Sequence, residues 1–132
     1  MYSVGIDVSK SKSMGAIMRP FGEIVASHFE VNHTDSELKQ LADRLKSLNG
    51  ETKIIMEYTG NYYQPIARYL HESGLFVITV HAKHIHNYGN NFIRKIKTDK
   101  SDAIKIADYG ISYWLDLPKF TPLYLLFPFS LR

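Results

Sequence analysis

The order of strand-like and helix-like segments constrains the fold of this chain more than any other feature. Three strand-like runs come first, at residues 2–8, 13–19 and 23–32, and the turn Pro20-Phe21-Gly22 suits a hairpin between the last two. Helical and strand patterns then alternate along the rest of the chain. Hairpin-linked strands followed by such alternation specify a mixed sheet with helices on its faces, so the sequence predicts an α/β fold.

The alternating part has recognisable boundaries. Thr34 and Glu37 form a capping box, and leucines at helical spacing follow until Asn49-Gly50. Unbroken apolar runs predict buried strands at residues 53–57 and 75–80, with a helix between them that ends at Gly74. Residues 81–97 are polar, and we expect a long connection with at most one short helical turn. A last helix is predicted from Asp99 to about Trp114.

Length and composition indicate one domain and exclude several kinds of site. With 132 residues, 45% of them hydrophobic, the chain can bury one ordinary core. The absence of cysteine excludes disulfides, thiolate zinc sites, thiol nucleophiles and redox pairs. The sequence has no apolar run long enough to span a bilayer and no signal-peptide pattern at its start. We therefore expect a cytoplasmic protein without a membrane partner.

The positive charge of the chain lies in one stretch. Residues 83–105 hold six of the 16 basic side chains against two acidic ones, a local charge of +4, whereas the whole chain carries +3. Such a stretch is typical of a groove that faces phosphates, although a solvated basic loop is the plainer alternative. The residues that we expect to contact nucleic acid are Lys83, Arg94, Lys95, Lys97 and Lys100.

Four carboxylates occupy positions where a merely solvating charge is not expected. Asp7 interrupts the apolar first strand, and Glu57 ends the buried strand 53–57. Both fall at strand ends, where open α/β sheets commonly place their sites. Asp99 and Asp102 are spaced i, i+3 and share the helix face that packs inward. A helix-dipole role explains Asp99 well but Asp102 poorly.

Carboxylates that converge repel each other and resist ionising unless a cation lies between them. Magnesium fits best, with manganese as a second choice, because it is a hard ion that prefers oxygen ligands. A pair of such ions can activate water and stabilise a leaving oxygen in phosphodiester chemistry. We therefore predict that Asp7, Glu57, Asp99 and Asp102 are both metal ligands and catalytic residues.

Three segments carry a resemblance to a known family. Gly5-Ile6-Asp7-Val8-Ser9-Lys10, Met56-Glu57-Tyr58-Thr59-Gly60 and Lys97-Thr98-Asp99-Lys100-Ser101-Asp102-Ala103 resemble the DEDD transposases, insertion-sequence recombinases related to the Piv DNA invertase. The resemblance implies an RNase H-like, RuvC-like domain in which these four acids bind magnesium. It also implies action on insertion-sequence DNA ends, in some members directed by a structured guide RNA, and a homo-oligomer in the full-length protein.

The chain departs from that family pattern after Trp114. The resemblance implies a helical linker and a second domain with a serine nucleophile, but residues 120–132 contain no acid, two prolines and mostly Leu, Phe and Tyr. We expect a catalytic domain at residues 1–115 and a truncated, non-native tail at 116–132. Complete recombination would then need the serine-bearing domain.

Two other classes of protein share part of these features. Residues 5–11 also resemble the first phosphate loop of actin-like kinases and ATPases, but Ser9 stands where that loop prefers glycine. The second alternative is a nucleic-acid-binding module that keeps the fold without cutting. Four converging acids disfavour it, because they oppose phosphate binding unless a metal is present.

Overall fold

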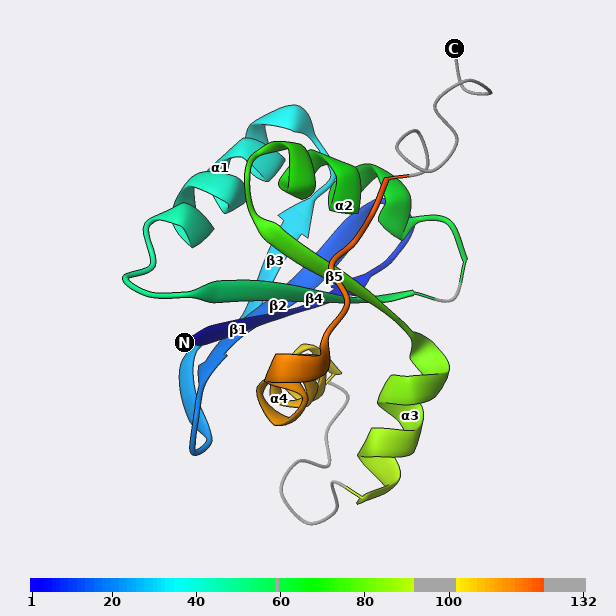
Figure 1. Cartoon of the computed structure of the whole chain (residues 1–132). Helices are drawn as coiled ribbons and strands as arrows, with labels where there is room; N and C mark the ends of the chain where they lie inside the picture. The colour runs from blue at the N-terminus through cyan, green and yellow to red at the C-terminus, as the bar shows by residue number, and fades with distance from the viewer. Residues whose placement is uncertain (59, 92–101, 123–132) are drawn as a thin grey trace.

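The protein folds around a five-stranded mixed sheet (Figure 1). The computed structural model describes residues 1–58, 60–91 and 102–122. The strand order is β3-β2-β1-β4-β5, with β1 antiparallel to β2, β2 antiparallel to β3, and β4 and β5 parallel to β1. The strands are β1 (Tyr2–Val8), β2 (Lys12–Arg19), β3 (Glu23–Asn32), β4 (Thr52–Tyr58) and β5 (Phe76–His81). The predicted α/β class, the hairpin strands and the mixed sheet are confirmed.

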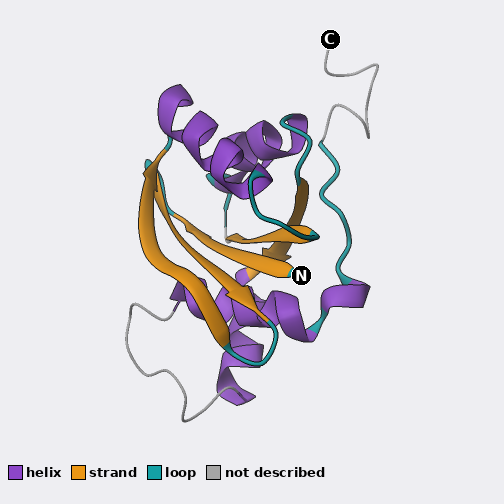
Figure 2. Ribbon diagram, turned by 90° about the vertical axis from the view of Figure 1, so that its left-hand side faces the viewer, coloured by secondary structure: helices purple, strands orange, loops and turns teal. Residues whose placement is uncertain are grey.

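Helices cover both faces of the sheet, as Figures 1 and 2 show. Helices α1 (Asp35–Lys46) and α2 (Tyr63–Glu72) pack on one face, against a cluster that includes Val4, Ile6 and Ile54. Helix α4 (Asp102–Ser112) packs on the other face, and α3 (Ala82–Asn91) extends beyond the end of β5. Alternate strand residues therefore face different helices, and the α4 face is the one that carries the predicted acids.

Helix α1 begins as its capping box predicts. The Thr34 hydroxyl accepts a hydrogen bond from the Glu37 backbone N–H at 3.3 Å. The Glu37 carboxylate reaches back past Thr34 and accepts from the backbone and side-chain N–H groups of Asn32, both at 2.9 Å. These bonds tie the helix start to the end of β3 and lower the pKa of Glu37.

The prediction of a loop from residue 81 was wrong, because residues 82–91 form the ten-residue helix α3. Its sequence is polar, and tertiary contacts account for its helical state. Ile85 is buried against β5 and α4, and the Tyr88 hydroxyl donates a hydrogen bond to the carboxylate of Asp108. Burial and this bond raise the pKa of Tyr88 to about 12, so the hydroxyl remains a neutral donor.

Helix α4 is described from Asp102 onward, so the predicted helix start at Asp99 lies outside the described residues. The helix ends at Ser112, and a short 3-10 turn, η2 (Trp114–Asp116), follows. The buried residues of the predicted inward face include Ala103, Ile106 and Gly110. The apolar stripe thus packs inward as predicted, whereas Asp102, which we expected on the same inward face, is exposed at the helix start.

Residues 117–122 run back along the sheet toward α2 (Figure 1). The Phe120 N–H donates to the Val77 carbonyl of β5 at 2.6 Å, and its ring meets His71 edge-on with 5.8 Å between ring centroids. Phe120 is only 7% exposed. This segment covers part of the open edge of β5, although we assign it to the tail that begins at residue 116, and that boundary stays a prediction.

Within the described residues, none of the helices has the length and apolar character needed to cross a membrane.

Candidate active site

Asp7 and Glu57 lie side by side near the carboxyl ends of two neighbouring parallel strands. The register of β1 and β4 pairs them directly. Paired residues of parallel strands project to the same face of a sheet. Both side chains are half-buried, and both project on the face that α4 covers. Asp7 and Glu57 thus lie at strand ends, as predicted, and next to each other.

The position of α4 places a third acid, Asp102, toward the same end of the sheet. A Cβ atom at Gly5 would overlap the backbone of Ala103 and Ala107, so only glycine permits this approach. The Ser3 hydroxyl donates to the Ala107 carbonyl at 2.6 Å. Because Gly110 lies opposite Ser3 and Ala103 lies opposite Gly5, α4 runs in the direction opposite to β1. Its first residue, Asp102, therefore lies toward the Asp7 end of the strand.

The negative charges of neighbouring acids act on Asp7 and Glu57. Burial raises the pKa of Glu57 to about 7, and the negative charges of Asp7 and Asp102 contribute to the rise. Burial and the charge of Asp102 likewise raise the pKa of Asp7. Like charges in a partly desolvated place disfavour ionisation.

Lys105 is a neighbour of this cluster that the sequence reasoning counted only as part of the basic stretch. Its positive charge partly opposes the rise in the pKa of Glu57. It lies one helical turn beyond Asp102, and that i, i+3 spacing was the available signal.

Asp7, Glu57 and Asp102 together offer only oxygen donors, and hard divalent cations prefer oxygen. Among the residues that the structure describes, no three acidic or histidine side chains are gathered closely enough to hold a metal ion as they stand. The fourth predicted acid, Asp99, lies outside the described residues. The charge distribution fits a divalent cation, and coordination would require the side chains to converge further.

Comparison of the sequence with protein families decides the affiliation of the chain. The model of a family described as a transposase, of the DEDD and IS110 type, matches residues 4–123. The chain belongs to this DEDD transposase family. The resemblance of the three motif segments is thereby confirmed, and the actin-like alternative is set aside. No curated protein of similar sequence matches the chain.

Two solved structures show the fold of this DEDD transposase domain. The RuvC of T. thermophilus in complex with Holliday junction substrate has 11% sequence identity and a TM-score of 0.65, and the match covers 91% of this chain and 99% of that one. A second Thermus thermophilus RuvC structure has 11% identity and a TM-score of 0.63, with 91% and 100% covered. The predicted RNase H-like, RuvC-like fold is confirmed.

The predicted nucleic-acid contacts of the transposase domain are described only in part. Lys83 is exposed in the first turn of α3. The other four basic residues, Arg94, Lys95, Lys97 and Lys100, lie outside the described residues, so their grouping stays a prediction.

The tyrosines beside Glu57 divide into two environments. Tyr58 stacks on Tyr63 with ring centroids 4.6 Å apart, so these two rings pack against each other. Tyr62 is exposed.

Proposed function

We propose that this transposase domain cleaves DNA phosphodiester bonds at a site formed by Asp7, Glu57, Asp99 and Asp102, with Mg²⁺ as the cofactor and Mn²⁺ as a substitute. The observation that carries the proposal is the direct pairing of Asp7 with Glu57 at the ends of two parallel strands. Burial and the charges of Asp7 and Asp102 raise the pKa of Glu57 to about 7, as expected of acids placed together. A purely structural arrangement gains nothing from placing like charges together in a half-buried place.

The residues of the chain would have three roles: to bind the metal, to hold the ligands in place and to orient the DNA. Asp7, Glu57 and Asp102 would supply oxygen ligands from two strand ends and one helix start, and Asp99 would supply a fourth from the same helix face. When bound, the metal would supply Lewis-acid chemistry: activation of a water and stabilisation of the leaving oxygen. The glycine contact that fixes α4 against β1 would hold the ligands in place, and basic residues of the stretch 83–105 would orient the phosphate backbone.

The substrate class follows from the family and from the fold. The chain belongs to a transposase family, and one structure of the same fold holds a Holliday junction. We propose branched DNA or insertion-sequence ends as the substrate, contacted by Lys83, Arg94, Lys95, Lys97 and Lys100. A structured guide RNA and a second copy of the protein are the further partners of this proposal. Complete strand exchange would also require a serine-bearing domain of the kind found in the family.

Metal binding gives the first test, because it needs no activity. Titration of the protein with Mn²⁺ by calorimetry should give binding that Asp7→Asn weakens by about tenfold or more, since the variant lacks one ligand and one negative charge. Asp43→Asn is the matched control, because Asp43 is exposed on α1, across the sheet, and pairs with Lys39 at 2.9 Å. Equal affinity of all three proteins would contradict the site.

Cleavage gives the second test. The protein is incubated with labelled branched and linear DNA in Mg²⁺, in Mn²⁺ and in a chelator. Nicking should require the metal, disappear in Asp7→Asn and persist in Asp43→Asn. Metal-independent nicking, or nicking that survives in Asp7→Asn, would refute the assignment of the four acids.

A further inference from the structure

A hollow of about 300 Å³ opens beside the end of β5, where α3, α4 and the turn η2 meet. Its lining is rich in rings and polar groups, and the carboxylate cluster uses none of them. The side chains that matter for its chemistry are Tyr58, His81, His84, Tyr109, Tyr113 and Asp116.

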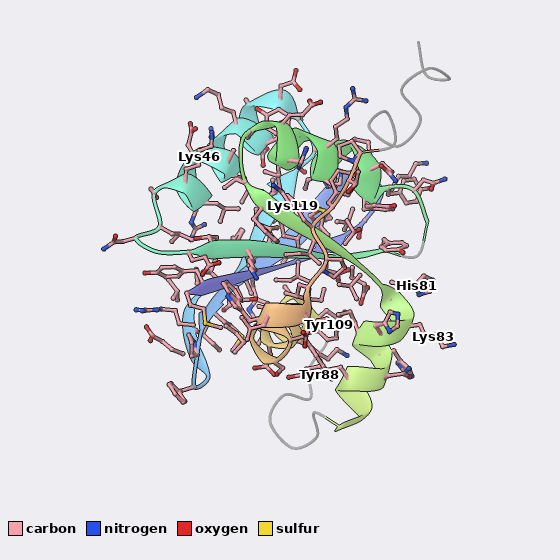
Figure 3. The ribbon with its side chains drawn as sticks, in the orientation of Figure 1. Lys46, His81, Lys83, Tyr88, Tyr109 and Lys119 are labelled. Carbon is pink, nitrogen blue, oxygen red and sulfur yellow. The ribbon has the colours of Figure 1, made fainter. Side chains whose placement is uncertain are left out.

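Two tyrosines of α4 and the turn after it supply flat apolar surface. The rings of Tyr109 and Tyr113 lie 4.7 Å apart between centroids, tilted by 40°. Tyr109 is held from behind by Tyr88, whose ring meets it edge-on at 5.5 Å; Figure 3 shows both in the space between α3 and α4. Tyr113 is 44% exposed. A pre-positioned tyrosine that is partly exposed is suited to stack on another flat ring.

The polar groups of the hollow are mostly accessible. The Lys83 backbone N–H donates to Nδ1 of His81 at 3.0 Å, so the neutral His81 ring carries its proton on Nε2 and can donate from there. His84 and Asp116 are exposed, one a donor or acceptor and the other an acceptor. Figure 3 shows His81 and Lys83 where β5 passes into α3. These groups can pair with the edge of a base and with an adjoining phosphate.

The hollow is also adjacent to the candidate active site. Tyr58, which lines it, follows Glu57 directly, and Val80, another lining residue, is the register partner of Glu57 on β5. A nucleotide in the hollow would therefore be close along the strand to a phosphate held at the carboxylates.

We propose that this hollow binds one unpaired nucleobase of the nucleic acid whose backbone reaches the carboxylate cluster, an inference that rests on the proposed function. Its volume is at the lower end of the range for ligand pockets, so it suits a single base rather than a larger group. A base would stack one flat face on Tyr113 and present its polar edge to Asp116 and His84. Stacking of this kind is tolerant of base identity, so we expect little sequence preference.

The test is a thermodynamic cycle between Tyr113 and the base. Fluorescence anisotropy measures binding of a short labelled DNA strand, and of the same strand made entirely of abasic sites, in a chelator so that metal binding plays no part. Tyr113→Leu should weaken binding of the normal strand by about fivefold or more and leave binding of the abasic strand unchanged. An unchanged melting temperature shows that the variant is folded. We expect this result because the Tyr113 side chain is exposed.

A second pair of variants tests the polar side of the hollow. His84→Gln should weaken binding of the normal strand, whereas His86→Gln should not, because His86 is exposed on the same helix but does not line the hollow. A parallel series uses RNA in place of DNA. The nucleic acid for which Tyr113→Leu affects the normal strand more than the abasic strand, and by the larger factor, is the one that supplies the base. Photo-crosslinking of a 5-iodouracil strand to the unaltered protein should mark Tyr109, Tyr113 or His84.

The proposal fails if Tyr113→Leu weakens both strands equally, if it weakens neither, or if the crosslinks fall only elsewhere. These outcomes are independent of the carboxylate site. A coupling in the cycle with no metal binding would refute the proposed function alone, and metal-dependent nicking without coupling would refute the hollow alone.

Discussion

Replacing Glu57 by glutamine should stabilise the metal-free protein, and the gain should depend on pH. The substitution removes one negative charge from the cluster at nearly constant side-chain volume. Moving a carboxyl pKa from 4.5 to about 7 corresponds to about 3.4 kcal/mol when the group is fully buried. Glu57 is half-buried, so solvent screening reduces the expected gain to about 1–2 kcal/mol.

The sign follows from proton binding in the two states. The pKa of Glu57 is higher in the folded than in the unfolded protein. At pH 4 the carboxyl is therefore largely protonated in both states and does not lower the free energy of unfolding. As pH rises from about 4.5 to about 7, the unfolded chain releases the proton first, and the wild-type protein loses stability. Glu57→Gln should therefore match wild type at pH 4 and exceed it at pH 8.

Urea unfolding at pH 4 and pH 8 measures the free energies directly, and thermal melting at pH 8 should show a rise of about 4–8 °C. Glu51→Gln is the control, because Glu51 is exposed just before β4 and lies outside the cluster. The electrostatic explanation is refuted if the stability difference between Glu57→Gln and wild type is the same at pH 4 and pH 8. It is also refuted if the variant is less stable than wild type at both pH values. Saturating Mg²⁺ should then reverse the order at pH 8 by stabilising only the wild type.

Three further predictions concern packing and charge. Gly5→Ala should destabilise the domain by about 1–3 kcal/mol in urea unfolding, because the new methyl group meets the backbone of α4, and it should also weaken Mn²⁺ binding. Lys53→Met should lower the melting temperature, because the buried Lys53 ammonium donates to the carbonyl of Trp114 at 2.7 Å and lies over the rings of Phe76 and Trp114. An unchanged melting temperature would show that η2 does not depend on Lys53. Replacing Arg94, Lys95 and Lys97 by alanine should flatten the slope of log K against log salt for duplex DNA, by about 0.9 for each phosphate that is no longer neutralised, and an unchanged slope would exclude them from the interface.

The strands, and the location of Asp7 and Glu57 at strand ends, could be predicted because local patterns determine them. The Pro20-Phe21-Gly22 turn defines a hairpin and the apolar run before Glu57 defines a strand, whereas the pairing of Glu57 with Asp7 comes from the long-range contact of β1 with β4. Helix α3 could not be predicted in the same way. Its polar sequence is stabilised by one buried isoleucine and by the bond from Tyr88 to Asp108, a residue 20 positions away. The i, i+3 spacing places Lys105 near Asp102, but its action on Glu57 depends on where α4 packs, and the close contact at Gly5 that sets this position is a long-range feature.

The close contact of α4 with β1 has a consequence for how substitutions would act. The backbones of the helix and the strand approach closely at Gly5, and Ser3 bonds to Ala107, so contacts with β1 hold the helix that begins at Asp102. Under the proposed function, substitutions in residues 92–98 would alter nucleic-acid contacts. Substitutions at Gly5 or Ser3 would instead alter the position of Asp102.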